Sequence, residues 1–377
     1  MSFCQRCGMA SLLVLLAVSA PHFANAGDSP VQTEIYAAGE NDYAAFRIPA
    51  IVCTSKGMLL AFAEGRVNGQ GDNGNIDTVL KRSTDGGRTW STLTVVGDMG
   101  TDAFCNPCPL VDRSNGRIWL PLIWKAGENH TIQNKRGTGR GTMDVYLLYS
   151  DDDGVTWSKP QNVNAQVKRA DWTWYVAGPG NGIQLASGRL MFPCNHRTPK
   201  DQNDKASYSH VIYSDDHGKT WQIGGECERK TNECQIAELA NGDILMSIRS
   251  HESPDKLRAF STSTDQGLTW SPVRFAKGVP DPTCQGSLIR LPDSAGKNSL
   301  LFSNPASTSR ERMTVRLSKD GGETWPLSCV LHEGSSAYSS LVMLPDGRAA
   351  CLYERGTTKG KDITGLVFAT FELDLLK

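Results

Sequence analysis

The sequence lacks an excess of charge of either sign. It contains 39 lysines and arginines against 40 aspartates and glutamates, and its formal net charge is −1 over 377 residues. Binding to nucleic acids or to anionic membrane surfaces requires a concentration of positive charge. We therefore expect neither of these partners.

Long apolar runs are also scarce. The one that stands out extends from Ala10 to Ala20, and about ten apolar residues are too few for a membrane-spanning helix, which needs roughly 20. Arg6 precedes this run and an Ala-x-Ala pattern ending at Ala26 follows it, an order typical of a secretory signal peptide. We predict that residues 1–26 are a signal peptide cleaved near Ala26, and that the mature chain has no membrane span and is secreted or periplasmic.

A second Cys-x-x-Cys motif is missing. The single copy, "CNPC" at Cys105 to Cys108, has no partner motif to complete a metal site, so we expect neither a metal nor another cofactor. Nine of the 11 cysteines follow residue 26, and an odd number leaves at least one thiol unpaired. Cys227 and Cys234 are the candidate disulfide. Three cysteines inside apolar runs are expected to be buried thiols: Cys53, Cys194 and Cys351.

What the sequence has in abundance is an eight-residue frame, Ser-x-Asp-x-Gly-x-Thr-Trp. Its five copies begin at Ser83, Ser150, Ser214, Ser263 and Ser318. Aspartate can accept hydrogen bonds from nearby backbone N–H groups, glycine supplies a positive φ, and tryptophan covers apolar packing. Each copy has too few carboxylates for calcium, which takes six to eight oxygen ligands. We interpret the frames as structural turns, since five copies cannot form one active site.

The frames belong to a larger repeat. A short apolar segment is followed by a glycine turn and a second apolar strand, as in "GMLLAFAEGR" and "GRIWLPLIW", and this pattern occurs six times. An alternating strand, the frame and a further short strand follow in five of the six units. Four antiparallel strands per unit, repeated six times, predict an all-β, six-bladed β-propeller that fills residues 27–377 as one domain. We expect the spare strand at residues 31–38 to complete the last blade.

Strand direction predicts where chemistry can occur in such a ring. The starts of the first strands, the ends of the second strands and the loops that follow them share one face, and the frames lie on the other. Eight polar residues fall at these positions: Arg47, Arg66, Asp72, Glu233, Arg249, Arg312, Tyr338 and Glu354. We predict that they converge at one mouth of the propeller.

Six of these eight residues lie in motifs that resemble a known family. "FRIP" at residues 46–49, the five frames, "EGR", "NECQIAEL", "SIRS", "RMTVRLS" and "GSSAYSSL" resemble the exo-α-sialidases (neuraminidases) of bacterial and animal type over essentially the whole mature chain. The resemblance implies a catalytic group: Asp72 as acid/base, Tyr338 as nucleophile and Glu233 as its partner. It also implies substrate-binding and supporting residues: Arg47, Arg249 and Arg312 as an arginine triad, Arg66 as a further substrate contact, and Glu354 as the carboxylate that holds Arg47.

The residue types suit that chemistry. Sialic acid carries a carboxylate on its anomeric carbon, which guanidinium groups bind by charge-assisted, bidentate hydrogen bonds. An aspartate or glutamate nucleophile would be repelled by this carboxylate, whereas a neutral phenol is not, and sialidases are the tyrosine exception among glycosidases. Free tyrosine titrates near about 10, so Tyr338 needs Glu233 as a base. Asp72 would protonate the leaving oxygen and later activate water, which predicts retention.

The sequence leaves alternatives open for the acid and for the activity. Asp77 competes with Asp72 for the role of acid. The same residues could serve a trans-sialidase, acting between or within molecules, and a non-catalytic sialoglycan-binding propeller would keep the arginines but lose Tyr338, Glu233 or Asp72. We expect a monomer whose partners are sialylated glycans. Four residues are candidates for contacts with the apolar parts of the sugar: Met99, Trp124, Trp172 and Trp174.

Overall fold

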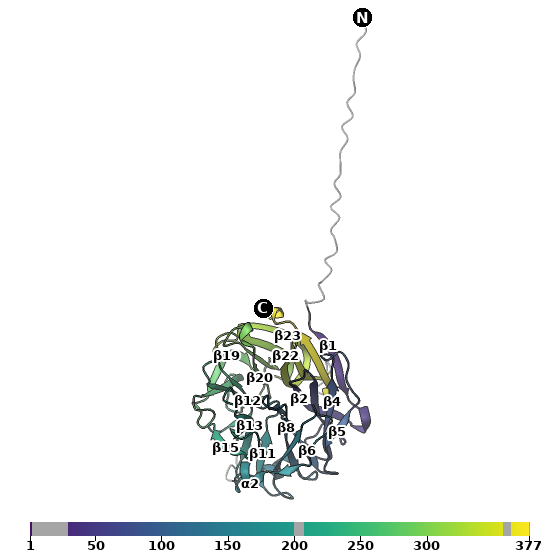
Figure 1. Ribbon diagram of the computed structural model, residues 1–377, viewed down its shortest axis with the longest axis vertical. Helices are drawn as coiled ribbons and strands as arrows, with labels where there is room; N and C mark the ends of the chain where they lie inside the picture. Colours follow the sequence, from purple (N-terminus) through teal and green to yellow (C-terminus); the bar gives the residue numbers. More distant parts are fainter. Residues whose placement is uncertain (2–28, 200–206, 357–362, 377) are drawn as a thin grey trace.

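The computed structural model describes residues 1, 29–199, 207–356 and 363–376. The predicted signal peptide and its cleavage site at Ala26 lie outside the described residues. The fold is all-β, and Figure 1 shows its sheets arranged around a common centre. The two α-helices in the described part of the chain are short, α1 (Thr131–Arg136) and α2 (Asn164–Val167), and none there is long and apolar enough to cross a bilayer.

The strands form four hydrogen-bonded sheets. The first contains β2 (Ala45–Cys53), β3 (Leu59–Arg66), β4 (Ile76–Ser83), β5 (Thr94–Gly97), β6 (Ala103–Cys105), β7 (Leu110–Val111), β8 (Ile118–Lys125), β9 (Asp144–Ser150) and β10 (Gln161–Asn162). The second contains β11 (Trp174–Ala177), β12 (Ile183–Gln184), β13 (Leu190–Arg197), β14 (Tyr208–Ser214) and β15 (Gln222–Glu226).

The third sheet contains β16 (Thr231–Glu238), β17 (Ile244–Ser250), β18 (Leu257–Ser263) and β19 (Arg274–Pro280). The fourth contains β1 (Val31–Ala37), β20 (Ser287–Arg290), β21 (Leu300–Pro305), β22 (Glu311–Ser318), β23 (Leu327–Met343), β24 (Ala349–Gly356) and β25 (Ile363–Phe371). Three short 3-10 helices complete the described elements: Glu40–Asp42, Asp293–Ala295 and Leu373–Leu375.

The sheets do not correspond one to one with six separate blades. Ile76 in β4 pairs in parallel with Ala103 in β6, which joins the first two sequence units into one sheet. The 17-residue strand β23 pairs with both β22 and β24 and joins the last two units. The expected closure is confirmed, because β1 pairs antiparallel with β25, with Val31 opposite Thr370. An N-terminal strand therefore completes the sheet that contains the C-terminal strand.

The repeated frames are turns, as predicted. In the second copy Asp152 accepts hydrogen bonds from the backbone N–H and the hydroxyl of Thr156, at 2.9 and 2.6 Å, and from the hydroxyl of Ser150 at 2.8 Å. Trp157 of this copy packs edge-on against Phe62 of the preceding unit. A Cβ on Gly218 in the third copy would lie 2.3 Å from the ring of Trp119, again in the preceding unit. Each turn thus packs one unit against the previous one.

The cysteine predictions are partly wrong. All nine cysteines after residue 26 lie within the described residues and are free. The thiol of Cys227 approaches the sulfur of Met246 at 3.6 Å, while that of Cys234 donates to the carbonyl of Cys194 at 3.4 Å, so the predicted disulfide is absent. Cys194 and Cys351 are buried as expected, but Cys53 is only partly buried.

Candidate active site

Tyr338 lies at the centre of a polar cluster built from three strands. Its hydroxyl donates a 2.6 Å hydrogen bond to Oε1 of Glu233 in β16. Arg249 in β17 donates from Nη1 to Oε2 of the same carboxylate at 2.7 Å and to the Tyr338 hydroxyl at 3.0 Å. Glu233 and Tyr338 are 105 positions apart in the chain, so the ring of sheets brings them together. A phenol in contact with a carboxylate and a guanidinium is a nucleophile beside a base.

Glu354 in β24 fixes the opposite side of this cluster. Its side chain is fully buried and accepts hydrogen bonds from Nε and Nη2 of Arg47 at 3.0 and 3.1 Å. The same carboxylate accepts from the backbone N–H groups of Ile48, at 2.9 Å, and Tyr338, at 3.2 Å. Ile48 has a φ of 55°, and the pairing of β2 with β3 is irregular here. This local distortion lets the guanidinium and the following N–H group reach one carboxylate.

The third arginine of the cluster is Arg310, not the predicted Arg312. The guanidinium carbon of Arg310 lies 5.6 Å from the centre of the Tyr338 ring, and that of Arg47 lies 5.4 Å from it. The Nε atom of Arg312 instead faces Glu333 at 3.5 Å. Arg312 has a φ of 62°, and the pairing of β22 with β23 shifts between Glu311 and Met313. A regular strand would place residues 310 and 312 on one face, but this bulge turns them apart.

Arg66, the predicted further substrate contact, is buried and binds groups of the protein, and its contact with substrate stays a prediction. It donates from Nε and Nη2 to Oε2 of Glu64, and from Nη1 to Oδ1 of Asp72 at 2.9 Å and to the carbonyl groups of Gln70 and Gly71. Glu64 is buried and also accepts from the backbone N–H of Asn106. Arg66 therefore holds the loop at residues 67–75 in place.

Asp72 lies beside the arginines, as predicted. Its side chain is 58% exposed, and Oδ1 lies 3.7 Å from Nη1 of Arg47. Partial burial raises the pKa of this carboxyl group, but the positive charges of Arg66, Lys125 and Arg47 outweigh that effect, and the pKa is lowered. Asp77, the alternative acid, is buried in β4 and accepts a 2.7 Å hydrogen bond from the hydroxyl of Tyr43. The structure brings Asp72, and not Asp77, into contact with the arginines.

Charge and burial set the protonation of the central groups. Burial, followed by the negative charge of Glu233, raises the pKa of the Tyr338 hydroxyl well above its ordinary value, despite the opposing effect of Arg249 and Arg310. Burial disfavours the charged form of Arg249, but the negative charge of Glu233 outweighs this effect, and the pKa of Arg249 is raised. The phenol is thus neutral and the guanidinium charged at any working pH. The arginines of this cluster can attract an anionic ligand, and the neutral phenol beside them does not repel it.

Sequence reasoning missed Arg310, Glu64 and Lys125. Arg310 was hidden by a bulge that the sequence does not indicate, and Glu64 is visible only as part of the quoted "EGR". Of the four apolar candidates, Trp172 is buried and stacks on His196 with the ring centres 3.6 Å apart. Three others are partly buried: Met99, Trp124 and Trp174. Among the described residues, no group of three or more His, Cys, Asp or Glu side chains could hold a metal ion.

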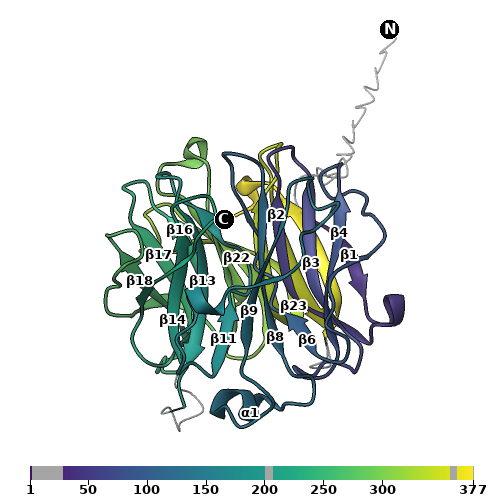
Figure 2. The same cartoon turned by 60° about the horizontal axis from the view of Figure 1, so that its bottom comes forward.

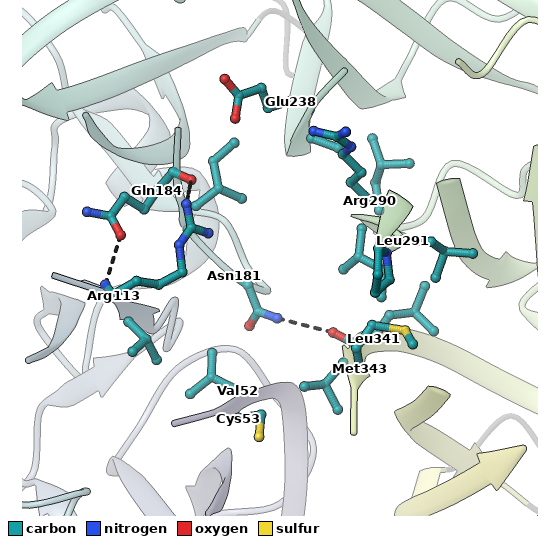
Figure 3. A pocket seen from close by; sticks show the side chains of 18 of the residues that line it. Val52, Cys53, Arg113, Asn181, Gln184, Glu238, Arg290, Leu291, Leu341 and Met343 are labelled. Carbon is teal, nitrogen blue, oxygen red and sulfur yellow. Dashed lines mark hydrogen bonds between the residues drawn. The ribbon is translucent and has the colours of Figure 1, made fainter. Parts of the chain in front are cut away.

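A separate cavity of about 920 Å³ lies at the other end of the first strands. It is lined by Cys53, where β2 ends, while Arg47 belongs to the start of that strand. Figure 3 shows Asn181 in this cavity donating to the carbonyl of Leu341, with Arg113, Gln184, Glu238 and Arg290 around it. Figure 2 shows the strands running between the two faces of the ring. The Tyr338 cluster is therefore distinct from this cavity.

Comparison with known proteins identifies the family. The family model of a BNR repeat-like domain matches residues 57–351. A sialidase of Bacteroides fragilis is 33% identical over 84% of this chain, and a sialidase of Micromonospora viridifaciens is 36% identical over 92%. This chain spans only 61% and 55% of the lengths of those two proteins. The solved structure of a Hadza microbial sialidase is 32% identical, with a TM-score of 0.81 over 92% of this chain and 69% of that one.

The BNR match includes the strands that carry Glu233, Arg249 and Tyr338, and the fold is shared as well as the sequence. The chain belongs to the sialidase family.

Proposed function

We propose that this protein is a retaining exo-α-sialidase, which hydrolyses terminal α-linked sialic acid from glycoproteins, glycolipids and oligosaccharides through a covalent tyrosyl intermediate. The observation that carries the proposal is the 2.6 Å hydrogen bond from the Tyr338 hydroxyl to Glu233, with Arg249 bound to both groups. The names of the relatives support this substrate class. A neutral phenol beside a base and a set of arginines suits a sugar that carries a carboxylate at its reacting carbon.

The sugar carboxylate is bound by Arg47, Arg249 and Arg310. Their guanidinium groups surround Tyr338 and stay charged at any working pH. Three cations packed together repel one another, and Glu354 and Glu233 offset that repulsion through the ion pairs with Arg47 and Arg249. We assign the third arginine role to Arg310 in place of Arg312.

Tyr338 and Asp72 both act in the first chemical step, Tyr338 as the nucleophile and Asp72 as the acid. The Tyr338 oxygen forms a bond to the anomeric carbon as the glycosidic carbon–oxygen bond breaks, and its proton passes to Oε1 of Glu233, the atom it already contacts. Asp72 gives its proton to the departing oxygen. In the second step Asp72 takes a proton from water, the water oxygen attacks the same carbon, and Tyr338 leaves and regains its proton from Glu233. Two displacements at one carbon give net retention.

We further propose that the described sheets form one six-bladed catalytic domain. The repeat in the sequence supports this count, because the first and last sheets each contain two repeat units. The N-terminal pattern that ends at Ala26 supports export of the mature chain.

The experiment follows the first product formed. The full chain is incubated with 3′-sialyllactose, and proton NMR identifies the anomer of free sialic acid before it mutarotates. We expect the α-anomer. First appearance of the β-anomer would contradict retention, a 2,7-anhydro sugar or a sialylated acceptor would indicate transfer instead, and binding without any product would indicate a non-catalytic sialoglycan-binding protein.

A further inference from the structure

The loop that carries Asp72 is held by the neighbouring repeat unit. Within its own unit the loop closes through a hydrogen bond from the backbone N–H of Val67 to the carbonyl of Asn75, at 3.2 Å. Across the boundary the N–H of Gly74 donates to the carbonyl of Gly127 at 2.8 Å. Gly127 follows β8 and belongs to the second unit. The acid, two residues before Gly74, therefore depends on where Gly127 lies.

Asp102 holds Gly127 through the N–H group of this glycine, whereas the loop of Asp72 binds its carbonyl. The Oδ1 atom of Asp102 accepts a 2.9 Å hydrogen bond from the N–H of Gly127, and its Oδ2 atom accepts one from the indole N–H of Trp124 at 3.2 Å. Arg140 forms an ion pair with the same carboxylate. The side chain of Asp102 is 15% exposed. One carboxylate thus holds a backbone group, an indole and a guanidinium in a single arrangement.

Gly127 is packed against backbone and has no room for a side chain. A Cβ at this position would lie 2.0 Å from the carbonyl oxygen of Thr101 and 3.2 Å from that of Gly74. Asp102 also approaches the start of β4 through its own backbone, because its carbonyl accepts from the N–H of Ile76 at 3.5 Å. Two backbone segments from different units meet here without any side chain between them, and the carboxylate is the polar group that sets their spacing.

We propose that Asp102 is a positioning residue for the acid/base Asp72, acting through Gly127 and Gly74. The inference rests on the proposed function. It matters because a proton donor must lie within hydrogen-bond reach of the leaving oxygen, and a displacement of about 1 Å can lower a rate by roughly 100-fold. Arg66 binds the same loop at Gln70, Gly71 and Asp72, whereas Asp102 acts on it through Gly127 at Gly74.

The test compares two substrates in the full chain. An aryl sialoside releases a phenolate, which leaves without a proton, whereas sialyllactose releases a sugar alkoxide and needs the acid. We measure kcat/KM for both with the wild type, Asp102→Asn and Asp102→Ala. For Asp102→Ala we expect a fall of at least about tenfold with sialyllactose, from the general-acid contribution, and a much smaller fall with the aryl sialoside. Asp102→Asn retains one acceptor for Gly127 and should give an intermediate ratio.

Two measurements separate positioning from loss of folding. Affinity for a dehydrated sialic acid analogue, which has no leaving group, reports the arginine pocket and should stay near the wild-type value in both variants. The matched control is Asp112→Asn: Asp112 is a fully buried aspartate that binds Ser114, Asn115 and Gln184 beside the opposite cavity. Its ratio of the two kcat/KM values should equal that of the wild type.

The outcomes distinguish this inference from the proposed function. Asp102 does not position the acid if the wild type hydrolyses both substrates and the Asp102 variants lower kcat/KM equally for the two. The same conclusion holds if the variants lower neither value. If the wild type hydrolyses neither substrate, the proposed function itself is wrong.

Discussion

Glu233 and Tyr338 come from different sheets and share a 2.6 Å hydrogen bond, with the phenol as the donor. The pKa of Tyr338 is raised by burial and by the charge of Glu233, so the phenol attacks only if that carboxylate takes its proton. The proposed role of Tyr338 as nucleophile therefore depends on this contact.

Glu233→Gln removes the base and leaves the shape of the site unchanged. We expect kcat to fall at least about 100-fold, the lower range for a positioned general base, and to fall equally for aryl sialosides and sialyllactose, since both need the nucleophile. Steady-state kinetics with both substrates measures this. The matched control is Glu238→Gln at the far end of the same strand, which binds the N–H of Ala186 and should react at close to the wild-type rate. A Glu233→Gln enzyme with wild-type kcat would refute the assignment.

The two neighbouring arginines give the second prediction. Arg310→Ala removes a guanidinium that faces Tyr338, and loss of a hydrogen bond to a charged group costs about 1.5–3 kcal/mol, which lowers kcat/KM roughly ten- to hundredfold. Arg312→Ala removes a group that faces Glu333 and should leave kcat/KM almost unchanged. A larger fall in kcat/KM for Arg312→Ala than for Arg310→Ala would show that Arg312 is the third arginine of the triad.

The third prediction concerns pH. The pKa of Asp72 is lowered by Arg66, Lys125 and Arg47, against the effect of burial, so its protonated fraction falls as pH rises through the acidic range. We expect kcat/KM for sialyllactose to decrease with rising pH. Lys125→Met removes one of these positive charges, which raises the pKa of Asp72 and should move the falling limb to higher pH.

The matched control for that shift is Lys168→Met, a second lysine with a largely buried side chain, which forms an ion pair with Asp144 at 3.5 Å. Its pH profile should coincide with that of the wild type. An unshifted limb in Lys125→Met would show that Asp72 does not control the profile.

The repeated turns give a prediction about stability. Hydrogen bonds from the side chain and backbone of Thr156 lower the pKa of Asp152 from 3.8 to about 2. Because the folded pKa is the lower one, the charged carboxylate stabilises the fold above about pH 4, and this stabilisation is lost as pH falls toward about 2. Asp152→Asn should lower the free energy of unfolding by about 1 kcal/mol at neutral pH, and the difference should shrink in acid.

Urea unfolding at several pH values measures this difference. Asp153→Asn is the control, because Asp153 forms a surface ion pair with Lys56 and such pairs contribute little. A deficit in Asp152→Asn that persists undiminished in acid would contradict the role of the charge.

How far the sequence predicts this protein depends on the range of each interaction. The repeated frames were interpreted correctly because the hydrogen bonds that the aspartate at the third position of each frame accepts come from residues of the same frame. Arg47, Glu233, Arg249, Tyr338 and Glu354 were placed together because strand order alone decides which ends of the strands share a face. The error at Arg312 came from a bulge and a positive φ, which no residue type at that position indicates.

Arg66 and the cysteines show what spacing along the chain leaves out. The sequence does not reveal that Arg66 binds a carboxylate two residues earlier and the loop that follows it, and its contact with substrate stays a prediction. Cys227 and Cys234 are close in sequence, but Cys227 follows the end of β15 and Cys234 lies in β16 of the next sheet, and their thiols face different partners. Spacing along the chain does not predict the direction of a side chain.

The most direct test of the account is to trap the intermediate. The full chain is treated with a sialyl fluoride that carries a second fluorine at C3, which slows breakdown of a glycosyl-enzyme, and is digested for peptide mass spectrometry. We predict one added sialyl group on the peptide that contains Tyr338, and none in Tyr338→Phe. A label on an aspartate or glutamate, or turnover without any label, would contradict the tyrosyl mechanism.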